Sequence, residues 1–202
     1  MPDKINNKTN NKVNLDRFLA AIIFIVSVWF ISTLNLISFL PFSIPMLLPR
    51  DMSALPGIIS MPFLHGSFTH LMSNTIPLIV FSILISLKGN QYYLKVTVLI
   101  IIISGILLWL MGRNAYHIGA SGLIFGYFGF LLLRMFYSPS LLTIIISVGV
   151  FVLYGGIIFG IFPQTGVQAG VSGENISWEG HLFGLISGIL VAKIMKNDRL
   201  KN

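Results

Sequence analysis

Apolar positions along the chain gather into six long segments, separated by shorter stretches that are polar or rich in glycine and proline. A helix that rises ~1.5 Å per residue crosses a hydrocarbon core of ~30 Å in about 20 residues, which is close to the length of most of these segments. The pattern therefore predicts six membrane-spanning helices. They are expected over residues 18–40, 68–87, 95–111, 120–133, 140–162 and 178–195.

The remaining stretches divide the chain into one membrane domain, residues 18–196, and two polar tails, residues 1–17 and 197–202. The first tail is rich in Asn and Lys, a composition that favours disorder. The connection 41–67 holds several prolines and cannot form one straight helix, so we expect part of it to lie at the membrane interface. The glycine-rich loop 163–177 is expected to be mobile and to act as a lid.

Composition agrees with a membrane protein and removes several kinds of chemistry. Hydrophobic residues make up 55% of the chain, charged residues only 9%, and the mean hydropathy is +0.87. The absence of cysteine excludes disulfides, thiolate metal sites and cysteine nucleophiles. The net charge of +7 comes from basic residues scattered at the edges of apolar segments, without the basic patch that indicates nucleic-acid binding.

The basic residues predict how the spans are oriented. If the N-terminus is cytoplasmic, only Arg50 and Arg113 fall on the outer side. The inner side then holds eleven: Lys4, Lys8, Lys12, Arg17, Lys88, Lys95, Arg134, Lys193, Lys196, Arg199 and Lys201. Because cytoplasmic loops carry the excess of Lys and Arg, both termini are expected in the cytoplasm of a multi-pass cell-membrane protein.

Three polar islands interrupt the apolar segments: "HGSFTHLMSN" at 65–74, "HIGASGLIFG" at 117–126 and "WEGHLFGLISG" at 178–188. Asn74, Ser121 and His181 lie 12 to 14 residues before the Lys or Arg that ends the same span. At ~1.5 Å per residue, all three lie roughly 20 Å above the inner edge of the membrane. Three polar side chains from three helices are thus expected at one depth.

Small residues predict which helices touch. The fourth and sixth spans each carry glycines four residues apart, which make a bare face for close packing of membrane helices. These glycines are Gly122 and Gly126, and Gly180, Gly184 and Gly188. Close packing of the two faces brings Ser121 within hydrogen-bond reach of His181, and a serine hydroxyl becomes a good nucleophile when a neighbouring base takes its proton. His70 and Asn74, one turn apart, can donate hydrogen bonds to the developing oxyanion.

In these motifs the sequence resembles the rhomboid intramembrane serine proteases, from Phe18 to about Met195. "GASG" matches the family's G-x-S-G, which implies that Ser121 is the nucleophile, and "GHLFGLISG" matches its His-x-x-Gly-x-x-x-Gly, which implies that His181 is the base. "HGSFTHLMSN" matches the family's His-x4-His-x3-Asn. It implies that His70 and Asn74, with Ser121 itself, stabilise the oxyanion, and that His65 is structural.

The resemblance implies an all-α membrane protein, a bundle of six transmembrane helices with a short central fourth helix. It also implies hydrolysis of peptide bonds in or near the transmembrane segments of protein substrates by a Ser-His dyad, without cofactor or metal. Two positions depart from the family pattern. Phe125 stands where many members have a Tyr under the imidazole, and Pro56-Gly57 stands where some have a Trp-Arg pair that anchors the first loop.

Other polar residues have structural interpretations. Glu179 is two residues from His181, a spacing that points their side chains apart on a helix, so it is expected to be a solvated loop carboxylate. His117 precedes the fourth span and matches no motif, which favours a structural role. Pro77 is expected to be a tolerated kink.

Three functions remain open: an intramembrane protease, a catalytically silent relative that binds membrane helices, and a channel or small transporter. Intact Ser121 and His181 argue against the second. The third predicts charged residues within the spans, and the interiors of these spans carry none. Hydrolysis also requires water, so Ser121 is expected at the floor of a cavity that opens to the extracytoplasmic side.

Overall fold

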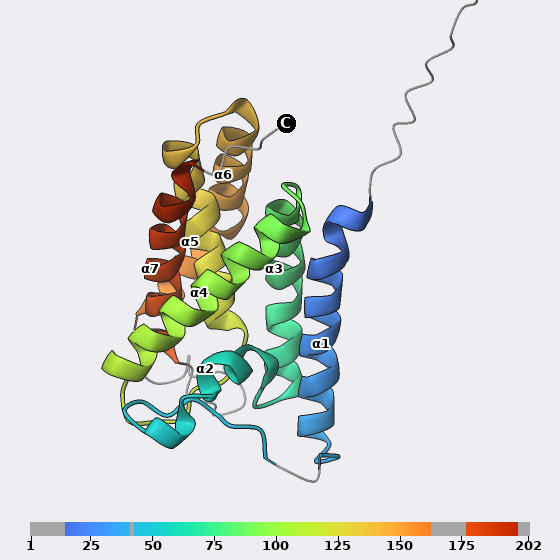
Figure 1. Cartoon of the computed structure of the whole chain (residues 1–202), viewed down its shortest axis with the longest axis vertical. Coiled ribbons are helices and arrows are strands. Elements are labelled where there is room, and N and C mark those ends of the chain that lie inside the picture. Colours follow the sequence, from blue (N-terminus) through green and yellow to red (C-terminus); the bar gives the residue numbers. More distant parts are fainter. Residues whose placement is uncertain (1–14, 41–42, 163–176, 198–202) are drawn as a thin grey trace, which may run out of the picture.

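The computed structural model describes residues 15–40, 43–162 and 177–197, and in these ranges the chain is a bundle of α-helices (Figure 1). Extended pairing is limited there to one isolated antiparallel bridge between Leu47 and His117. The predicted all-α class is therefore confirmed. Residues 1–14 of the predicted tail 1–17, residues 198–202 of the predicted tail 197–202 and residues 163–176 of the predicted lid loop lie outside the described residues.

Each of the six apolar segments forms a helix. These are α1 (Leu19–Leu36), α3 (Phe68–Ser86), α4 (Asn90–Met111), α5 (Ser121–Tyr137), α6 (Leu141–Tyr154) and α7 (Trp178–Ile194). By length and composition alone, four helical stretches of the described chain could cross a membrane: Asp16–Leu36, Phe68–Ser86, Asn90–Met111 and Leu141–Ile161. Helix α5 is a shorter apolar helix of 17 residues, and α7 also has 17 residues.

Several boundaries differ from the prediction. Helix α4 begins at Asn90, five residues before the predicted start, because Gly89 with φ of 95° ends the preceding turn and the polar and aromatic residues after it are helical. Helix α1 ends at Leu36 rather than at residue 40, and residues Leu15–Phe18 form a 3₁₀ turn rather than a tail. Helix α6 ends at Tyr154 and continues as 3₁₀ helix over Gly155–Ile161, where three glycines weaken the α-helix.

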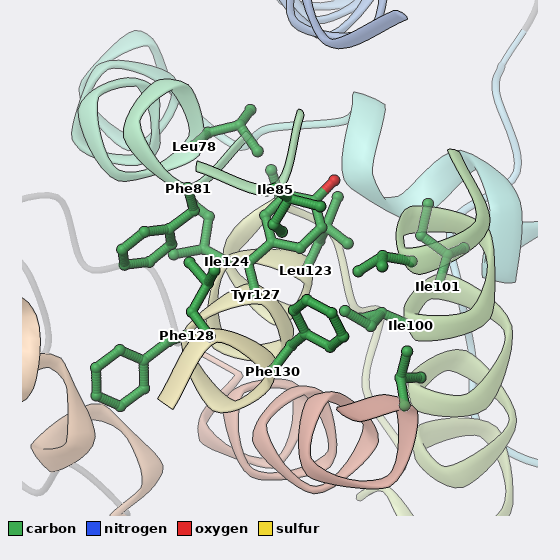
Figure 2. Packing of buried hydrophobic residues seen from close by; sticks show 14 of the residues in the cluster. Leu78, Phe81, Ile85, Ile100, Ile101, Leu123, Ile124, Tyr127, Phe128 and Phe130 are labelled. Carbon is green, nitrogen blue, oxygen red and sulfur yellow. The ribbon is translucent and has the colours of Figure 1, made fainter. Parts of the chain in front are cut away.

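Helix α5 occupies the centre of the bundle and packs against α3, α4, α6 and α7, most extensively against α7. Its buried side chains include Leu123, Tyr127 and Phe130. Figure 2 shows these residues meeting others from α3 and α4, among them Phe81 and Ile100. Helix α5 is the short central fourth span that the sequence predicted.

The connection between α1 and α3 contacts the loop that precedes α5 at both ends of that loop, at Gly112 and at His117. It contains 3₁₀ turns at Met52–Ala54 and Met61–Phe63 and the short helix α2 (Gly57–Ser60). Arg50 donates from Nη1 to the Gly112 carbonyl at 2.8 Å, and Trp109 donates from Nε1 to the Asp51 carbonyl at 2.9 Å. These hydrogen bonds hold the connection between α1 and α3 in place, although Pro56-Gly57 stands where some family members have a Trp-Arg pair.

The outer surfaces of α1 and α6 are apolar. Exposed side chains there include Ile23 and Phe30 on α1 and Phe151, Val152 and Leu153 on α6. In the stretches Asp16–Leu36 and Leu141–Ile161, only 17% of the most apolar 18-residue segment is buried inside the bundle. Large apolar surfaces of this extent are stable in contact with lipid, which agrees with a multi-pass membrane protein.

Candidate active site

The structure brings Ser121, the first residue of α5, to His181 in the first turn of α7. The distance from His181 Nε2 to Ser121 Oγ is 2.9 Å, and His181 Nδ1 lies 2.8 Å from the main-chain carbonyl of Gly160. A carbonyl oxygen only accepts, so Nδ1 carries the proton and donates it to Gly160. Nε2 is therefore left unprotonated toward Ser121, in the tautomer that accepts the hydroxyl proton.

The imidazole is also held by an aromatic ring. Phe125, one turn after Ser121 on α5, stacks on His181 with ring centroids 4.2 Å apart and an interplanar angle of 4°. A methyl group at Gly160 would lie 2.8 Å from Phe125 Cζ and 3.2 Å from His181 Nδ1, so only glycine leaves room for both rings. The stacking on Phe125 and the hydrogen bond to the Gly160 carbonyl together fix the orientation of the His181 ring.

The backbone before Ser121 is held in an unusual conformation. Gly119 has φ of 113°, a value that favours glycine, and its N–H donates to the Met61 carbonyl at 2.9 Å. The next residue, Ala120, has no polar side chain to cap α5, so the first main-chain N–H groups of this helix are without a capping side chain. The turn thus presents Ser121 together with donors at a helix N-terminus.

His65 supports this turn from the loop before α3. Ser32 Oγ lies 2.8 Å from His65 Nδ1 and 2.8 Å from the Phe63 carbonyl, while His65 Nε2 accepts the Ala120 N–H at 3.4 Å. Burial lowers the pKa of His65 to about 3, and the nearby His70 lowers it further in the same direction. A neutral His65 with its proton on Nδ1 satisfies all three bonds, which fits the structural role predicted for it.

The two predicted oxyanion donors are one turn apart on α3, which begins at its Ser67 cap. The His70 ring lies against the turn before Ser121, since a methyl group at Gly119 would be 2.9 Å from His70 Cε1 and 3.8 Å from Ser121 Oγ. Asn74 is buried, and within the described residues its Nδ2 has no hydrogen-bond partner. A buried amide without an acceptor is costly unless a ligand supplies one.

The predicted glycine faces meet along α5 and α7. A methyl group at Gly184 would overlap the Gly122 carbonyl oxygen, and one at Gly188 would overlap that of Gly126. A methyl group at Gly122 would lie 3.2 Å from the Gly180 carbonyl. Backbone therefore packs directly on backbone, and this approach carries His181 to Ser121.

Glu179 is not solvated, and that prediction is wrong. It is buried in the first turn of α7, and its Oε1 lies 3.4 Å from Nε of Arg113 in the loop before α5. Glu179 is buried because the loop before α5 folds over the start of α7 and supplies the cation Arg113. A carboxylate in the first turn also interacts favourably with the helix dipole. The two ring nitrogens of His181 bond Gly160 and Ser121, which agrees with the prediction that the Glu179 side chain points away from the imidazole.

His117 links the same loop to the cap of α7. Ser177 Oγ accepts the Gly180 N–H at 3.0 Å and lies 2.7 Å from His117 Nδ1, while His117 Nε2 lies 3.3 Å from the Arg113 carbonyl. The neutral ring donates from Nε2 and accepts from Ser177 at Nδ1, and burial lowers the pKa of His117 in favour of that form. His117 therefore positions the helix that carries His181.

Sequence reasoning missed the Gly160 carbonyl and the Arg113–Glu179 pair. Every residue has a main-chain carbonyl, so residue type does not indicate which carbonyl will bond His181. The sequence signal near this position is the cluster of glycines at 155, 156 and 160. In the part of the chain that the structure describes, no three His, Asp or Glu side chains are placed to bind a metal ion.

Comparison with known proteins gives the family. Residues 53–197 match the Rhomboid domain. Uncharacterized proteins of Mycobacterium tuberculosis and Mycobacterium bovis are 38% identical over 159 residues, which cover 76% of this chain and 64% of each relative. An uncharacterized protein of Mycobacterium leprae is 39% identical over 151 residues, which cover 72% of this chain and 58% of the relative.

The matched segment therefore spans less than two thirds of the length of these curated relatives. The Rhomboid domain match at residues 53–197 covers well over half of the chain and includes Ser121 and His181 with most of the helices that hold them. The chain belongs to the rhomboid family of membrane proteins.

Proposed function

We propose that this protein is an intramembrane serine endopeptidase that hydrolyses peptide bonds in or near transmembrane segments of other membrane proteins. The observation that carries the proposal is the position of His181, whose Nε2 lies 2.9 Å from Ser121 Oγ while Nδ1 is bound to the Gly160 carbonyl at 2.8 Å. This is the arrangement of a nucleophile, its base and a group that orients the base. A carbonyl here takes the orienting role that a carboxylate has in a triad.

In the first half of the reaction, His181 Nε2 takes the proton of Ser121 as Oγ attacks the carbonyl carbon of the substrate. The oxygen of the tetrahedral intermediate becomes negative and is stabilised by His70, by Asn74 Nδ2 and by the main-chain N–H of Ser121. His181 then gives its proton to the leaving amine, and an ester between the substrate and Ser121 remains.

In the second half, His181 accepts a proton from water, which attacks the ester carbonyl. The same donors stabilise the second tetrahedral intermediate, and the proton returns to Ser121 as the acid product leaves. The water reaches Ser121 from the extracytoplasmic side in the predicted orientation. Ser121 is half-buried in the described part of the chain.

The test is cleavage of a single-span model substrate by purified protein in liposomes, followed by mass spectrometry of both fragments. Ser121→Ala and His181→Ala should each abolish cleavage, and the double variant should be no worse than either, because residues that act as a unit are non-additive. Ser187→Ala is the matched control, since among the described residues Ser187 on α7 bonds the Phe183 carbonyl at 2.6 Å and no other group. Substantial turnover by Ser121→Ala would refute the proposal.

The alternative is a catalytically silent relative that binds membrane helices without cutting them. It predicts that the model substrate is retained by the protein and stays intact, equally for the native chain and for Ser121→Ala. The same experiment therefore separates binding from hydrolysis.

A further inference from the structure

A buried serine on α1 links this helix to the candidate active site. Helix α1 packs against α3 and α4 at the edge of the bundle, and it precedes the segment 53–197 that matches the Rhomboid domain (Figure 1). Ser32 has no exposed surface, and none of the sequence motifs includes it. Its hydroxyl lies 2.8 Å from the Phe63 carbonyl and 2.8 Å from His65 Nδ1, in the connection between α1 and α3.

The hydroxyl of Ser32 determines which nitrogen of His65 carries the proton. A carbonyl oxygen only accepts, so the hydroxyl donates to Phe63, and its oxygen is left to accept from His65 Nδ1. Nε2 is then unprotonated and accepts the Ala120 N–H at 3.4 Å. In the other tautomer, Nε2–H would face the Ala120 N–H donor to donor, and the one proton of Ser32 could satisfy only one of its two neighbours. The first tautomer therefore makes three hydrogen bonds and the second makes one.

The imidazole of His65 stays neutral, so its single proton has only two possible positions. The residue is 1% exposed, and burial lowers the pKa of His65 to about 3. The nearby His70 acts on this pKa in the same direction. At pH 7 the ring therefore cannot donate from both nitrogens, and a buried donor or acceptor left without a partner is costly.

The turn before Ser121 depends on the connection between α1 and α3 for two consecutive N–H groups. The Gly119 N–H donates to the Met61 carbonyl at 2.9 Å, and the Ala120 N–H donates to His65 Nε2. Ala120 has no exposed surface, where an N–H group needs an acceptor from the protein. The next N–H along the chain is that of Ser121, which the proposed mechanism uses for the oxyanion. The bond of Ala120 thus sets the position of the nucleophile and of this donor.

His65 also contacts His70, the predicted oxyanion donor on α3. The two imidazole rings meet edge to face, with centroids 5.0 Å apart and an interplanar angle of 73°. A rotation of the His65 ring toward another partner would therefore disturb His70 as well as the turn before Ser121.

We propose that Ser32 is a positioning residue of the candidate active site. It fixes the proton of His65 on Nδ1, and the His65 ring then holds the turn that presents Ser121 with its N–H. Ser32 acts only through His65 and contacts no reacting atom. The effect on reactivity rests on the proposed proteolysis, whereas the tautomer and the turn can be measured without a substrate.

The first experiment is ¹⁵N NMR of the full chain in detergent, labelled at histidine, because protonated and unprotonated ring nitrogens have well separated shifts. The signals of His65 are those that His65→Gln removes. The native chain should show Nδ1 protonated and Nε2 unprotonated at pH 7, and Ser32→Ala should show a second species with Nε2 protonated. Ser104→Ala is the matched control, since this buried serine of α4 bonds the Ile100 carbonyl of its own helix at 2.7 Å. An unchanged tautomer in Ser32→Ala would overturn the proposal.

The second experiment follows the turn and the nucleophile in the same variants. Hydrogen–deuterium exchange of the Ala120 amide should be about tenfold faster in Ser32→Ala than in the native chain, because its acceptor is lost. Reaction of Ser121 with a fluorophosphonate should be about tenfold slower, since a small displacement of a reacting group is costly. Ser104→Ala should match the native chain in both. Equal changes in the two serine variants would show that Ser32 is an ordinary packing residue.

A double variant shows whether the effect passes through His65. In a His65→Gln background, Ser32→Ala should change the labelling of Ser121 little further, because partners in one hydrogen-bond network are not additive. A further tenfold loss in that background would overturn the proposal. If the native chain took no label, the proposed proteolysis would fail, while the tautomer and the amide exchange would still decide the role of Ser32.

Discussion

The two ring nitrogens of His181 have different partners, since Nε2 faces the Ser121 hydroxyl and Nδ1 bonds the main-chain carbonyl of Gly160. The carbonyl of Gly160 cannot be ionised, so the orienting group contributes direction and a partial charge rather than a full negative charge. A base held in this way needs strong stabilisation of the oxyanion from other groups. At the residue scale, the proposal therefore depends on Asn74 and His70 as much as on the dyad.

Asn74→Ala should fold normally and lower kcat by about 10²-fold, the usual scale for one oxyanion donor. Binding of the substrate should change little, because the donor acts mainly as the carbonyl becomes tetrahedral. Steady-state cleavage in liposomes measures both quantities, and Met72→Ala, at an exposed position on the same helix, is the control. Equal losses in binding and kcat would indicate that Asn74 is structural.

His65 should make the fold sensitive to acid. The pKa of His65 is about 3 in the folded protein and near 6.5 otherwise, so the unfolded state binds more protons between these values. Its contribution to stability is thus complete above pH 6.5 and falls as pH drops, by at most about 1.4 kcal/mol per pH unit. His65→Gln should be less stable than the native chain at pH 7.5, yet should lose less stability on going to pH 5.

Thermal unfolding in detergent at the two pH values measures this difference. If both proteins lost the same stability on acidification, His65 would not be the group that titrates.

At the element scale, the packing of α5 on α7 decides whether the dyad forms. Gly188→Ala places a methyl group against the Gly126 carbonyl, and should destabilise the protein by about 1–3 kcal/mol, the usual cost of overpacking. Gly149→Ala on α6 meets no atom within 4 Å and should be neutral or slightly stabilising. Unfolding measured in mixed detergent compares the two variants. Similar stability of both would contradict direct backbone contact between α5 and α7.

Elements with local signals could be predicted from the sequence. Apolar segments gave the six helices, and glycines four residues apart gave the face on which α5 meets α7. The contact of Phe125 with His181 followed from the family pattern.

Features made by distant segments could not be predicted. Gly160 acts through its backbone, and its position depends on the change of α6 to 3₁₀ helix at Gly155. Glu179 is buried because the loop with Arg113 closes over it, and no spacing within one helix can indicate that.

At the scale of the whole molecule, the two ends of the bundle carry different chemistry. Figure 1 shows the starts of α5 and α7 at one end and their finishes at the other. Ser121 and the loop before it lie at the first end, while Arg134, Lys88 and Lys193 lie at the second. The predicted orientation places the first end outside the cell and the second in the cytoplasm.

Orientation can be measured because the chain has no cysteine. Tyr116→Cys, at a residue 63% exposed in the loop before α5, should react with a membrane-impermeant thiol reagent added to intact cells. Lys196→Cys, exposed at the end of α7, should react only after the membrane is opened. Mass shift of the labelled protein reports each result. The reverse pattern would place the candidate active site on the cytoplasmic side.

The most direct test of the central claim is the reaction of the detergent-solubilised protein with a fluorophosphonate, with the modified residue mapped by mass spectrometry. Because His181 removes the proton of Ser121, the native chain should be labelled at Ser121 alone, and Ser187 should stay unmodified. Ser121→Ala should show no label, and His181→Ala should react far more slowly. Absence of label from a folded native chain, or undiminished label in His181→Ala, would contradict a Ser121–His181 catalytic dyad.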